Sequence, residues 1–393
     1  MSGSRQFVSG DEAVALAVRL IKPHVIAAYP ITPQTIVVER LSDFVEDGSL
    51  RSEYMHVESE HSALAACMGA SAVGARTFTA TSSQGLLYMV ECLHYASGSR
   101  FPIVMMNANR SLAAPWSIFG DQRDSLSQLD CGWLQVYAED AQESLDLMLQ
   151  AYRIAEDASV LTPVMVNLDG FVLTHTYEVV EVPEATDVNR YLPPYKPTVK
   201  MDFEKPISMS ISAGPLWHTE FRLQQQQAAL HAREVIHAAE AEFEAVFGRH
   251  YNGLVEEYRC EDAEVVLATL GSVAGTVRLV VDELREGGTK VGLLKLRWLR
   301  PFPVEEVASI GERVKALGVL EKNISFGYEG SVYSEVNSAI VRNRNVPATI
   351  NFVAGLAGRD ITREDLIGMF NILQEAARGE KTDRVIFSQT RWG

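Results

Sequence analysis

The chain has 393 residues, of which 47% are hydrophobic and 22% are charged, so it can bury the cores of two globular domains. Its 35 basic and 51 acidic residues give a net charge of −16. This acidity, without a basic cluster, argues against nucleic acid and an anionic membrane surface as the main partner. The sequence also lacks an apolar run long enough to cross a bilayer.

The cysteines restrict the chemistry further. Cys67, Cys92, Cys131 and Cys260 are the four cysteines, and none belongs to a C-x-x-C pair. The chain therefore cannot hold a four-cysteine iron–sulfur cluster or zinc ion within one local motif. We interpret Cys67 and Cys92 as small buried hydrophobic residues. Few, scattered cysteines predict a reducing, cytoplasmic location.

The first two hundred residues alternate between helical and extended patterns. Helices are predicted over 10–22, 32–47, 59–74, 84–97 and 140–157, and strands over 24–30, 52–57, 76–83, 101–109, 133–139 and 162–171. This alternation has the spacing of a parallel sheet that helices cover on both faces. The sequence therefore predicts an α/β fold with parallel-rich sheets.

The middle of the chain changes character. Residues 183–216 carry six prolines and predict an extended surface connector, and 219–248 have the pattern of a long amphipathic helix. A second alternating unit begins near Ala263. We therefore expect a first domain over 1–200, a connector with a long helix over 201–254 and a second domain over 255–393.

Three strand ends of the first domain carry polar groups, and ligands collect at the carboxyl ends of strands in such sheets. The first is Tyr29-Pro30-Ile31-Thr32-Pro33, where we expect Thr32 to cap a helix whose first residue is Pro33. The second is Glu60, at the start of a helix that reads as buried nearly all round. A carboxylate there needs a hydrogen-bond partner or a ligand to offset its desolvation.

The third strand end places Arg110 directly after an apolar strand, where its planar guanidinium can bind a carboxylate. A surface ion pair with Asp121 or Asp124 is the alternative. Between the second and third ends lies the strand-to-helix junction of Ser83 and Gln84. It has no lysine, so it is not a phosphate-binding P-loop.

Two stretches of the second domain have structural interpretations. The segment 270–276, LGSVAGT, lacks a phosphate-binding pattern and predicts a tight turn with close packing. The segment 295–303, KLRWLRPFP, combines three cations with two prolines at a strand exit. We interpret it as an inter-domain or inter-subunit contact.

Taken together, these motifs resemble one protein family. The stretches YPITPQT, ESEHSA, FTATSSQGL, NRSLAAPWSIFGDQRD, TPVMVNLDGF, LATLGSVAGT and KLRWLRPFP are similar to the α subunits of pyruvate:ferredoxin oxidoreductases (pyruvate synthases), within the 2-oxoacid:ferredoxin oxidoreductases. The resemblance implies that the first domain is the pyrimidine-binding domain of a thiamine-diphosphate enzyme. It implies that the second domain resembles the carboxy-terminal domain of transketolase.

The resemblance also implies an assembly of several chains. The diphosphate and Mg²⁺ would lie on a β subunit, and the chain indeed contains no GDG motif and no NN pair. The [4Fe-4S] clusters would lie on γ and δ subunits or on a fused cluster-bearing chain. Pyruvate, coenzyme A and ferredoxin would be the reaction partners, and no metal ligand is assigned to this chain.

Residue roles follow from the matched motifs. Glu60 matches the family's catalytic glutamate, which hydrogen-bonds the aminopyrimidine ring and favours the tautomer that removes the thiazolium proton. Thr32 and Arg110 match the substrate-binding threonine and arginine. The same resemblance places five further residues against the cofactor: Tyr29, Pro30, Ile31, Ser83 and Gln84.

The substrate is expected to be a small 2-oxo acid. One neutral threonine beside one cation favours a monocarboxylate such as pyruvate, which would be oxidatively decarboxylated with coenzyme A to acetyl-CoA and CO₂. Another 2-oxo acid, such as phenylglyoxylate, a branched-chain acid or oxalate, remains an alternative on the same machinery. A non-catalytic, transketolase-like scaffold subunit is the alternative from another class.

Overall fold

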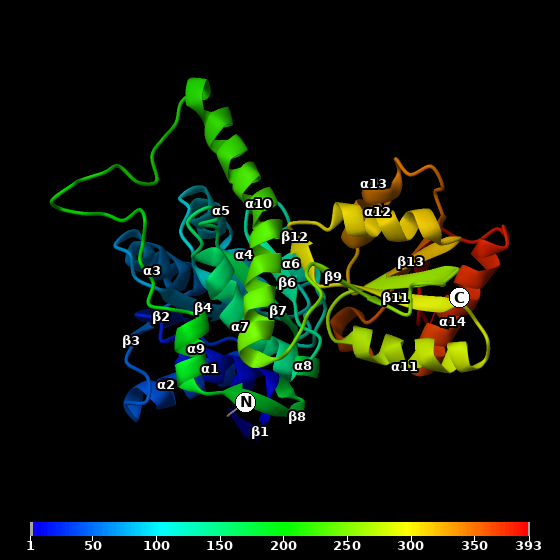
Figure 1. Ribbon diagram of the computed structural model, residues 1–393, viewed down its shortest axis with the longest axis horizontal. Helices are drawn as coiled ribbons and strands as arrows, with labels where there is room; N and C mark the ends of the chain where they lie inside the picture. Colours follow the sequence, from blue (N-terminus) through cyan, green and yellow to red (C-terminus); the bar gives the residue numbers. More distant parts are fainter. Residues whose placement is uncertain (1–2, 392–393) are drawn as a thin grey trace.

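The computed structural model describes residues 3–391, which form two α/β units side by side (Figure 1). The first unit is built on a seven-stranded sheet in the order β12-β6-β7-β5-β4-β2-β3. All neighbouring pairs in it are parallel except β12 with β6. Its strands are β2 (Val25–Ala28), β3 (Glu53–His56), β4 (Thr77–Thr81), β5 (Val104–Asn109), β6 (Leu134–Tyr137), β7 (Val164–Asp169) and β12 (Trp298–Arg300).

Helices cover both faces of this sheet. On one face an apolar core forms beneath α1 (Gly10–Ile21), α2 (Thr35–Glu46) and α7 (Ala141–Ala155). On the other face a second core forms beneath α3 (Glu60–Ala72), α4 (Ser83–Tyr88) and α5 (Val90–Gly98). Strands β1 (Gly3–Ser9) and β8 (Tyr177–Pro183) form a separate antiparallel ribbon. Three short helices complete the unit: α6 (Arg123–Leu126), α8 (Val172–His175) and α9 (Ala185–Tyr191).

The second unit has a six-stranded sheet in the order β15-β14-β13-β10-β11-β9. Helices α12 (Val304–Arg313) and α13 (Ser331–Ile340) pack on one face, and α11 (Val273–Glu286) and α14 (Arg363–Ala377) pack on the other. Its strands are β9 (Val255–Tyr258), β10 (Val265–Thr269), β11 (Val291–Leu296), β13 (Ala316–Glu321), β14 (Ala348–Val353) and β15 (Val385–Phe387), with a short 3₁₀ turn at Leu356–Gly358.

Helix α10 (Pro215–Phe247) follows the proline-rich connector and crosses the front of the first unit in Figure 1. Its second half packs through Ala232, Ile236, Ala239 and Phe243 onto the core beneath α1 and α7. The amphipathic pattern over 219–248 therefore corresponds to a helix that begins four residues earlier than predicted.

The predicted parallel-rich α/β fold is confirmed, but the edges of the sheets were not foreseen. Strands β9 and β12 pair antiparallel at sheet edges, and the β1–β8 ribbon lies outside both sheets. These strands depend on partners far away in sequence, so their local patterns are weak. The helix predicted over 84–97 is two helices, α4 and α5, which meet at Met89.

The predicted cap at Thr32 is wrong. Helix α2 begins at Thr35, and Gln34 takes the position before it. The side chain of Gln34 donates to the carbonyl of Tyr29 at 2.9 Å, and Arg110 donates to the carbonyl of Thr32 at 2.6 Å. These two contacts hold residues 29–34 as a turn and delay the start of the helix.

The segment 295–303 joins the two units, which confirms its interpretation as an inter-domain contact. Trp298 pairs with Val136 across β12 and β6, so a strand of the second unit extends the first sheet. The ammonium of Lys295 lies 2.8 Å from Glu143, and the guanidinium of Arg297 lies 2.8 Å from the other oxygen of the same carboxylate. Arg297 also pairs with Glu240 of α10.

A second junction lies at the turn of 270–276. Gly271 has φ of 73°, and a Cβ added there would lie 2.7 Å from the carboxylate of Asp169 at the end of β7. Asp169 accepts from the backbone and hydroxyl of Ser272 and forms an ion pair with Lys322. The predicted tight turn is therefore confirmed, and it docks the second unit onto the first.

None of the helices in the part of the chain that the structure describes combines the length and the apolar character needed to cross a bilayer.

Replacing Glu143 with glutamine should destabilise the protein strongly. The side chains of Glu143, Lys295 and Arg297 are almost fully buried, and removing one charge from such a cluster typically costs about 3–5 kcal/mol. We expect a loss of this size in urea unfolding at pH 7. Glu264→Gln, which breaks an exposed pair with Lys315, is the control and should change little.

The loss of folding stability in Glu143→Gln should depend on pH. Burial raises the pKa of Glu143, but the charges of Lys295 and Arg297 outweigh burial and lower it to about 2, below the ordinary 4.5. The pairing therefore stabilises the fold above pH 4.5, and this contribution is lost as the pH falls towards 2. The difference between wild type and Glu143→Gln should shrink over that range. A difference that grows on acidification would contradict this account.

Candidate active site

The carboxyl ends of β2, β4 and β5 meet the amino end of α3, and the predicted site residues lie around this junction. Glu60 is the first residue of α3, where Ser59 caps the helix by accepting from the backbone of Ser62 at 3.2 Å. The residue is only 8% exposed. Its carboxylate therefore lies at the mouth of a helix, in a largely desolvated position.

A glycine makes room for the carboxylate of Glu60. A Cβ built on Gly85 would lie 2.6 Å from Oε1 of Glu60 and 2.6 Å from Oγ1 of Thr81, closer than side-chain carbon atoms approach such groups. Gly85 lies in α4, so the backbone of that helix forms one wall beside the carboxylate. The hydroxyl of Thr81 is buried and has no hydrogen-bond partner among the described residues.

Arg110 lies on the other side of the junction and is 6% exposed. Its Nη1 donates to the carbonyl of Thr32 at 2.6 Å and its Nη2 donates to Gln84 at 3.4 Å, whereas Nε is buried without a partner in residues 3–391. Burial lowers the pKa of Arg110, and the charges of Asp124 and Glu60 act against this. These negative charges offset part of the effect of burial on the guanidinium.

Asp124 connects the strand ends, although sequence reasoning assigned it no role beyond an alternative ion pair. Its carboxylate accepts from the backbone N–H groups of Ser83 at 3.0 Å and Arg110 at 3.1 Å. It also accepts from the side-chain amides of Asn107 and Asn109. Burial raises the pKa of Asp124 to about 6, although these hydrogen bonds act to lower it. Asp124 thus joins the turn after β4 to the turn after β5.

Gln84 lies beside Arg110, and Ser83 precedes it at the turn after β4. Ser83 adopts φ of 51°, in the left-handed region that most side chains avoid. Its hydroxyl contacts Oε1 of Gln84 at 2.5 Å and donates to the carbonyl of Ser111 at 2.7 Å. This conformation turns the amide of Gln84 towards Arg110.

The turn after β2 lines the opening of the site. Tyr29 is 38% exposed, Pro30 and Thr32 are exposed, and Ile31 is half-buried. Thr32 contacts Arg110 through its backbone carbonyl, so its hydroxyl is free to meet a ligand. The loop after β5 exposes Trp116 by 71% and Phe119 by 50%, and the ring of Phe119 packs beside Phe171 with 5.1 Å between centroids.

Three supporting residues were missed from the sequence: Gln34, Gly85 and Asp124. Gly85 and Asp124 act through contacts between segments distant in the chain, and Gln34 acts through a bond from its side chain to the backbone five residues before it. For Asp124 a signal was present, because an acidic residue near a strand-end arginine was noted as an ion-pair partner. The structure shows that it binds the backbone of Arg110.

The arrangement can hold a polar ring and a small anion together. The residues fit the pyrimidine half of a thiamine cofactor on two observations: the cradle at Gly85 beside the Glu60 carboxylate, and the unpartnered hydroxyl of Thr81. Arg110 has an unpaired buried N–H that suits a carboxylate. Nothing among the described residues of this junction resembles a diphosphate cradle.

Comparisons with known proteins agree with these features. Residues 16–241, more than half of the chain, match the family described as pyruvate flavodoxin/ferredoxin oxidoreductase, thiamine diphosphate-binding. Residues 263–366 match the pyruvate:ferredoxin oxidoreductase core domain II.

Several curated relatives are similar over most of their length. Pyruvate synthase subunit PorA of Methanothermobacter thermautotrophicus is 52% identical over 355 residues, which cover 90% of this chain and 91% of that protein. The same subunit of Pyrococcus furiosus is 46% identical, over 97% of this chain and 96% of that protein. Ketoisovalerate oxidoreductase subunit VorA of Pyrococcus horikoshii is 45% identical, over 97% of both chains.

Two solved structures share the fold. A 2-oxoglutarate:ferredoxin oxidoreductase from Magnetococcus marinus, with 2-oxoglutarate, coenzyme A and succinyl-CoA bound, superposes with a TM-score of 0.72 at 20% identity. The match covers 95% of this chain but only 66% of that longer one. An inactive tetramer of a split-gene transketolase gives a TM-score of 0.53 at 12% identity and covers 96% and 100% of the two chains.

Proposed function

The chain belongs to the pyruvate flavodoxin/ferredoxin oxidoreductase family, and from this premise we propose that it is the subunit supplying the pyrimidine half of a thiamine-diphosphate site that oxidises pyruvate. The assembled enzyme converts pyruvate and coenzyme A to acetyl-CoA and CO₂ and passes the electrons to ferredoxin. The observation that carries the proposal is that two buried charged side chains, Glu60 in the Gly85 cradle and Arg110, both lie at the carboxyl end of the same sheet.

Glu60 acts on the pyrimidine ring. Thiamine diphosphate, when bound, supplies the nucleophilic carbon and the electron sink that decarboxylation of a 2-oxo acid needs. The carboxylate of Glu60 holds a proton against a ring nitrogen, and the surrounding protein excludes the water that would compete for it. The lack of a side chain at Gly85 leaves the carboxylate the space it occupies. Tyr29, Pro30, Ile31, Ser83 and Gln84 line the rest of the opening.

Arg110 and Thr32 bind the substrate. The free Nε–H of Arg110 completes a planar pair of donors for a carboxylate, and the exposed hydroxyl of Thr32 reaches the keto oxygen. One guanidinium balances one carboxylate, which favours pyruvate over a diacid such as oxalate. A branched-chain 2-oxo acid is the second candidate, because a ketoisovalerate oxidoreductase subunit is 45% identical to this chain.

The remaining parts of the reaction belong to other chains of the assembly. A β subunit holds the diphosphate and Mg²⁺, since this sequence has no GDG motif and no NN pair. Cluster-bearing γ and δ subunits, or one fused chain, carry [4Fe-4S] groups for which this chain has too few clustered cysteines. The assembly works in the cytoplasm.

The chain itself divides into three parts. Residues 1–200 form the pyrimidine-binding domain, 201–254 form the connector with the long helix, and 255–393 form the transketolase-like domain.

Removing the charge of Glu60 should stop catalysis without unfolding the chain. Glu60→Gln keeps the shape of the side chain but loses the proton acceptor, and such contributions are typically about 10²–10⁴-fold in rate. Gly85→Ala should cause a similar loss, because the new methyl group displaces the carboxylate. The measurement is pyruvate-dependent dye reduction by the purified complex with coenzyme A.

Gly368→Ala is the matched control for the glycine variant. Gly368 is half-buried on α14 of the second unit, and a Cβ there meets nothing within 4 Å, so turnover should be unchanged. Wild-type turnover in Glu60→Gln would make Glu60 a helix-end residue only and would favour the non-catalytic scaffold.

Replacing Arg110 with lysine should weaken substrate capture. Lysine keeps the charge but loses the planar fork, so we expect KM for pyruvate to rise about tenfold or more while thiamine diphosphate binding persists. Steady-state kinetics over pyruvate, 2-oxoisovalerate, 2-oxoglutarate and oxalate measure both the variant and the specificity. The proposal expects pyruvate to have the highest kcat/KM in the wild type. An unchanged KM in the variant would remove the carboxylate-binding role.

A further inference from the structure

A projecting arm, residues 199–223, is the largest feature that the site does not use. It consists of the irregular segment 199–214 and the first turns of α10, and it stands away from the first unit at the top left of Figure 1. No residue from Pro215 to Gln227 is buried, and Ala228 is the first buried residue of the helix. These turns lack the tertiary packing that normally stabilises a helix.

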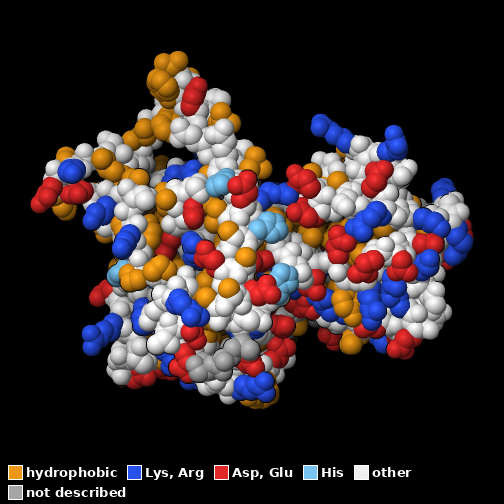
Figure 2. All heavy atoms as spheres, viewed as in Figure 1, with side chains coloured by type: hydrophobic (Ala, Val, Ile, Leu, Met, Phe, Trp, Pro, Cys, Tyr) orange, Lys and Arg blue, Asp and Glu red, His pale blue; other side chains and the backbone are white. Residues whose placement is uncertain are grey.

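The arm exposes large apolar side chains. Figure 2 shows hydrophobic atoms gathered at its tip and along its length, beside a hollow that separates it from the body. Phe203 is 92%, Leu216 is 77% and Trp217 is 61% exposed. The other exposed large hydrophobic residues of the arm are Val199, Met201, Ile207, Ile211, Phe221 and Leu223. An exposed apolar patch made of this many large side chains marks an interaction surface.

Charge distinguishes the arm from the rest of the molecule. Its charged residues are three basic and three acidic: Lys200, Lys205, Arg222, Asp202, Glu204 and Glu220. The arm is therefore neutral on a chain whose net charge is −16. A partner that binds the arm is therefore held by apolar contacts rather than by electrostatic attraction.

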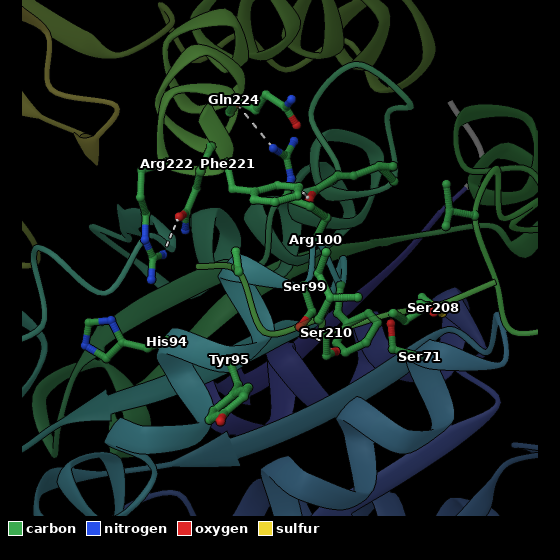
Figure 3. Close-up of a pocket in the computed structure, with 18 of the residues that line it drawn as sticks. Ser71, His94, Tyr95, Ser99, Arg100, Ser208, Ser210, Phe221, Arg222 and Gln224 are labelled. Carbon is green, nitrogen blue, oxygen red and sulfur yellow. Dashed lines mark hydrogen bonds between the residues drawn. The ribbon is translucent and has the colours of Figure 1, made fainter. Parts of the chain in front are cut away.

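The hollow beneath the arm is a cavity of about 860 Å³ between α5 and α10 (Figure 3). His94, Tyr95 and Arg100 lie on the body side, and Phe221 and Arg222 come from α10. The arm is anchored at its base, where the backbone of Met201 donates to the carbonyl of Ala72 at 2.7 Å and the hydroxyls of Ser99 and Ser210 lie 2.7 Å apart. The cavity is therefore held open by defined contacts.

Helix α3 connects the active site with the arm. It starts at Glu60 and ends at the arm's anchor, a length of about 20 Å. Helix α3 and the two residues after it carry no charged side chain from Ser62 to Gly74. Within this stretch Ala65, Gly69 and Val73 are exposed. The sequence predicted this helix to be buried nearly all round, and that prediction is wrong for the single chain. Next to it, Tyr88 and Tyr95 of α4 and α5 are 59% and 55% exposed.

We propose that the arm and the exposed side of α3 together bind the partner chain that carries the diphosphate and Mg²⁺ half of the thiamine site. This inference rests on the proposed function. A chain that completes the site must reach Glu60, and α3, whose exposed residues after His61 are uncharged, leads from there to the arm's anchor. A lasting interface needs about 800 Å² from each partner, more than the surroundings of one carboxylate offer. The arm supplies the additional apolar area.

Photo-crosslinking in the co-expressed complex identifies the occupant. The photoreactive residue p-benzoylphenylalanine is placed at Trp217, and at Leu279 of α11 as a control that is 69% exposed in the second unit. We expect a product from position 217 that contains peptides of the diphosphate-binding chain, and no such product from position 279. A crosslinked dimer of this chain, a product with a cluster-bearing chain, or no product would overturn the assignment.

A variant tests the energetic contribution. The combined substitutions L216S, W217S and F221S remove exposed side chains and should leave the thermal unfolding of the isolated chain unchanged. Affinity for the diphosphate-binding chain should fall about thirtyfold or more, as for central aromatic contacts of an interface. L279S should leave the affinity unchanged. Wild-type affinity in the arm variant would refute the proposal, even if the complex oxidises pyruvate.

The proposed function and the proposed docking surface can be contradicted independently of each other. A complex that assembles through the arm but oxidises no 2-oxo acid contradicts the proposed function and leaves the docking surface in place. An active complex whose assembly ignores the arm contradicts the docking surface alone.

Discussion

The carboxylate of Asp124 is the group on which the geometry of the candidate site depends. It binds backbone N–H groups from the turns after β4 and β5, which are 41 and 14 residues before it in the chain. Through these bonds it sets the left-handed conformation of Ser83, the orientation of Gln84 and the exit of Arg110 from its strand. A buried carboxylate with this many donors is costly to disturb, because each donor would be left unpaired. These contacts hold the turns that carry Ser83, Gln84 and Arg110 at the same end of the sheet as Glu60.

The second unit contributes to the site by fixing the sheet that carries it. Strand β12 extends the first sheet, the cluster of Lys295, Arg297 and Glu143 is buried between the units, and Asp169 at the end of β7 holds the turn at Gly271. These junctions lie on the β6 and β7 side of the sheet, whereas Glu60 lies on the β2 and β4 side. The helices that follow β3 and β4, namely α3, α4 and α5, expose Ala65, Gly69, Tyr88 and Tyr95 beside the charged Glu91.

Much of the fold could be predicted from the sequence, the candidate site residues stay a prediction, and the reasons for the misses are physical. The helices and central strands follow from local periodicity, and Glu60 and Arg110 stand out because their side chains are unusual at the ends of apolar segments. Strand β12 could not be recognised, because three residues form a strand only when β6 is beside them. The predicted helix cap at Thr32 was wrong because Gln34 and Arg110 bind the backbone of the turn over residues 29–34. The burial of α3 was overestimated because its uncharged face is exposed in the single chain.

The central claim is that this chain holds one half of a divided cofactor site, with a proton-handling carboxylate and a substrate-binding cation but no group for a diphosphate. Titration calorimetry with thiamine diphosphate and Mg²⁺ tests it most directly, on the chain alone and on the complex co-expressed with the diphosphate-binding and cluster-bearing chains. The account predicts no saturable binding to the chain alone and saturable binding, with pyruvate oxidation, in the complex. Tight binding of the cofactor by the chain alone, together with oxidation of pyruvate, would contradict it.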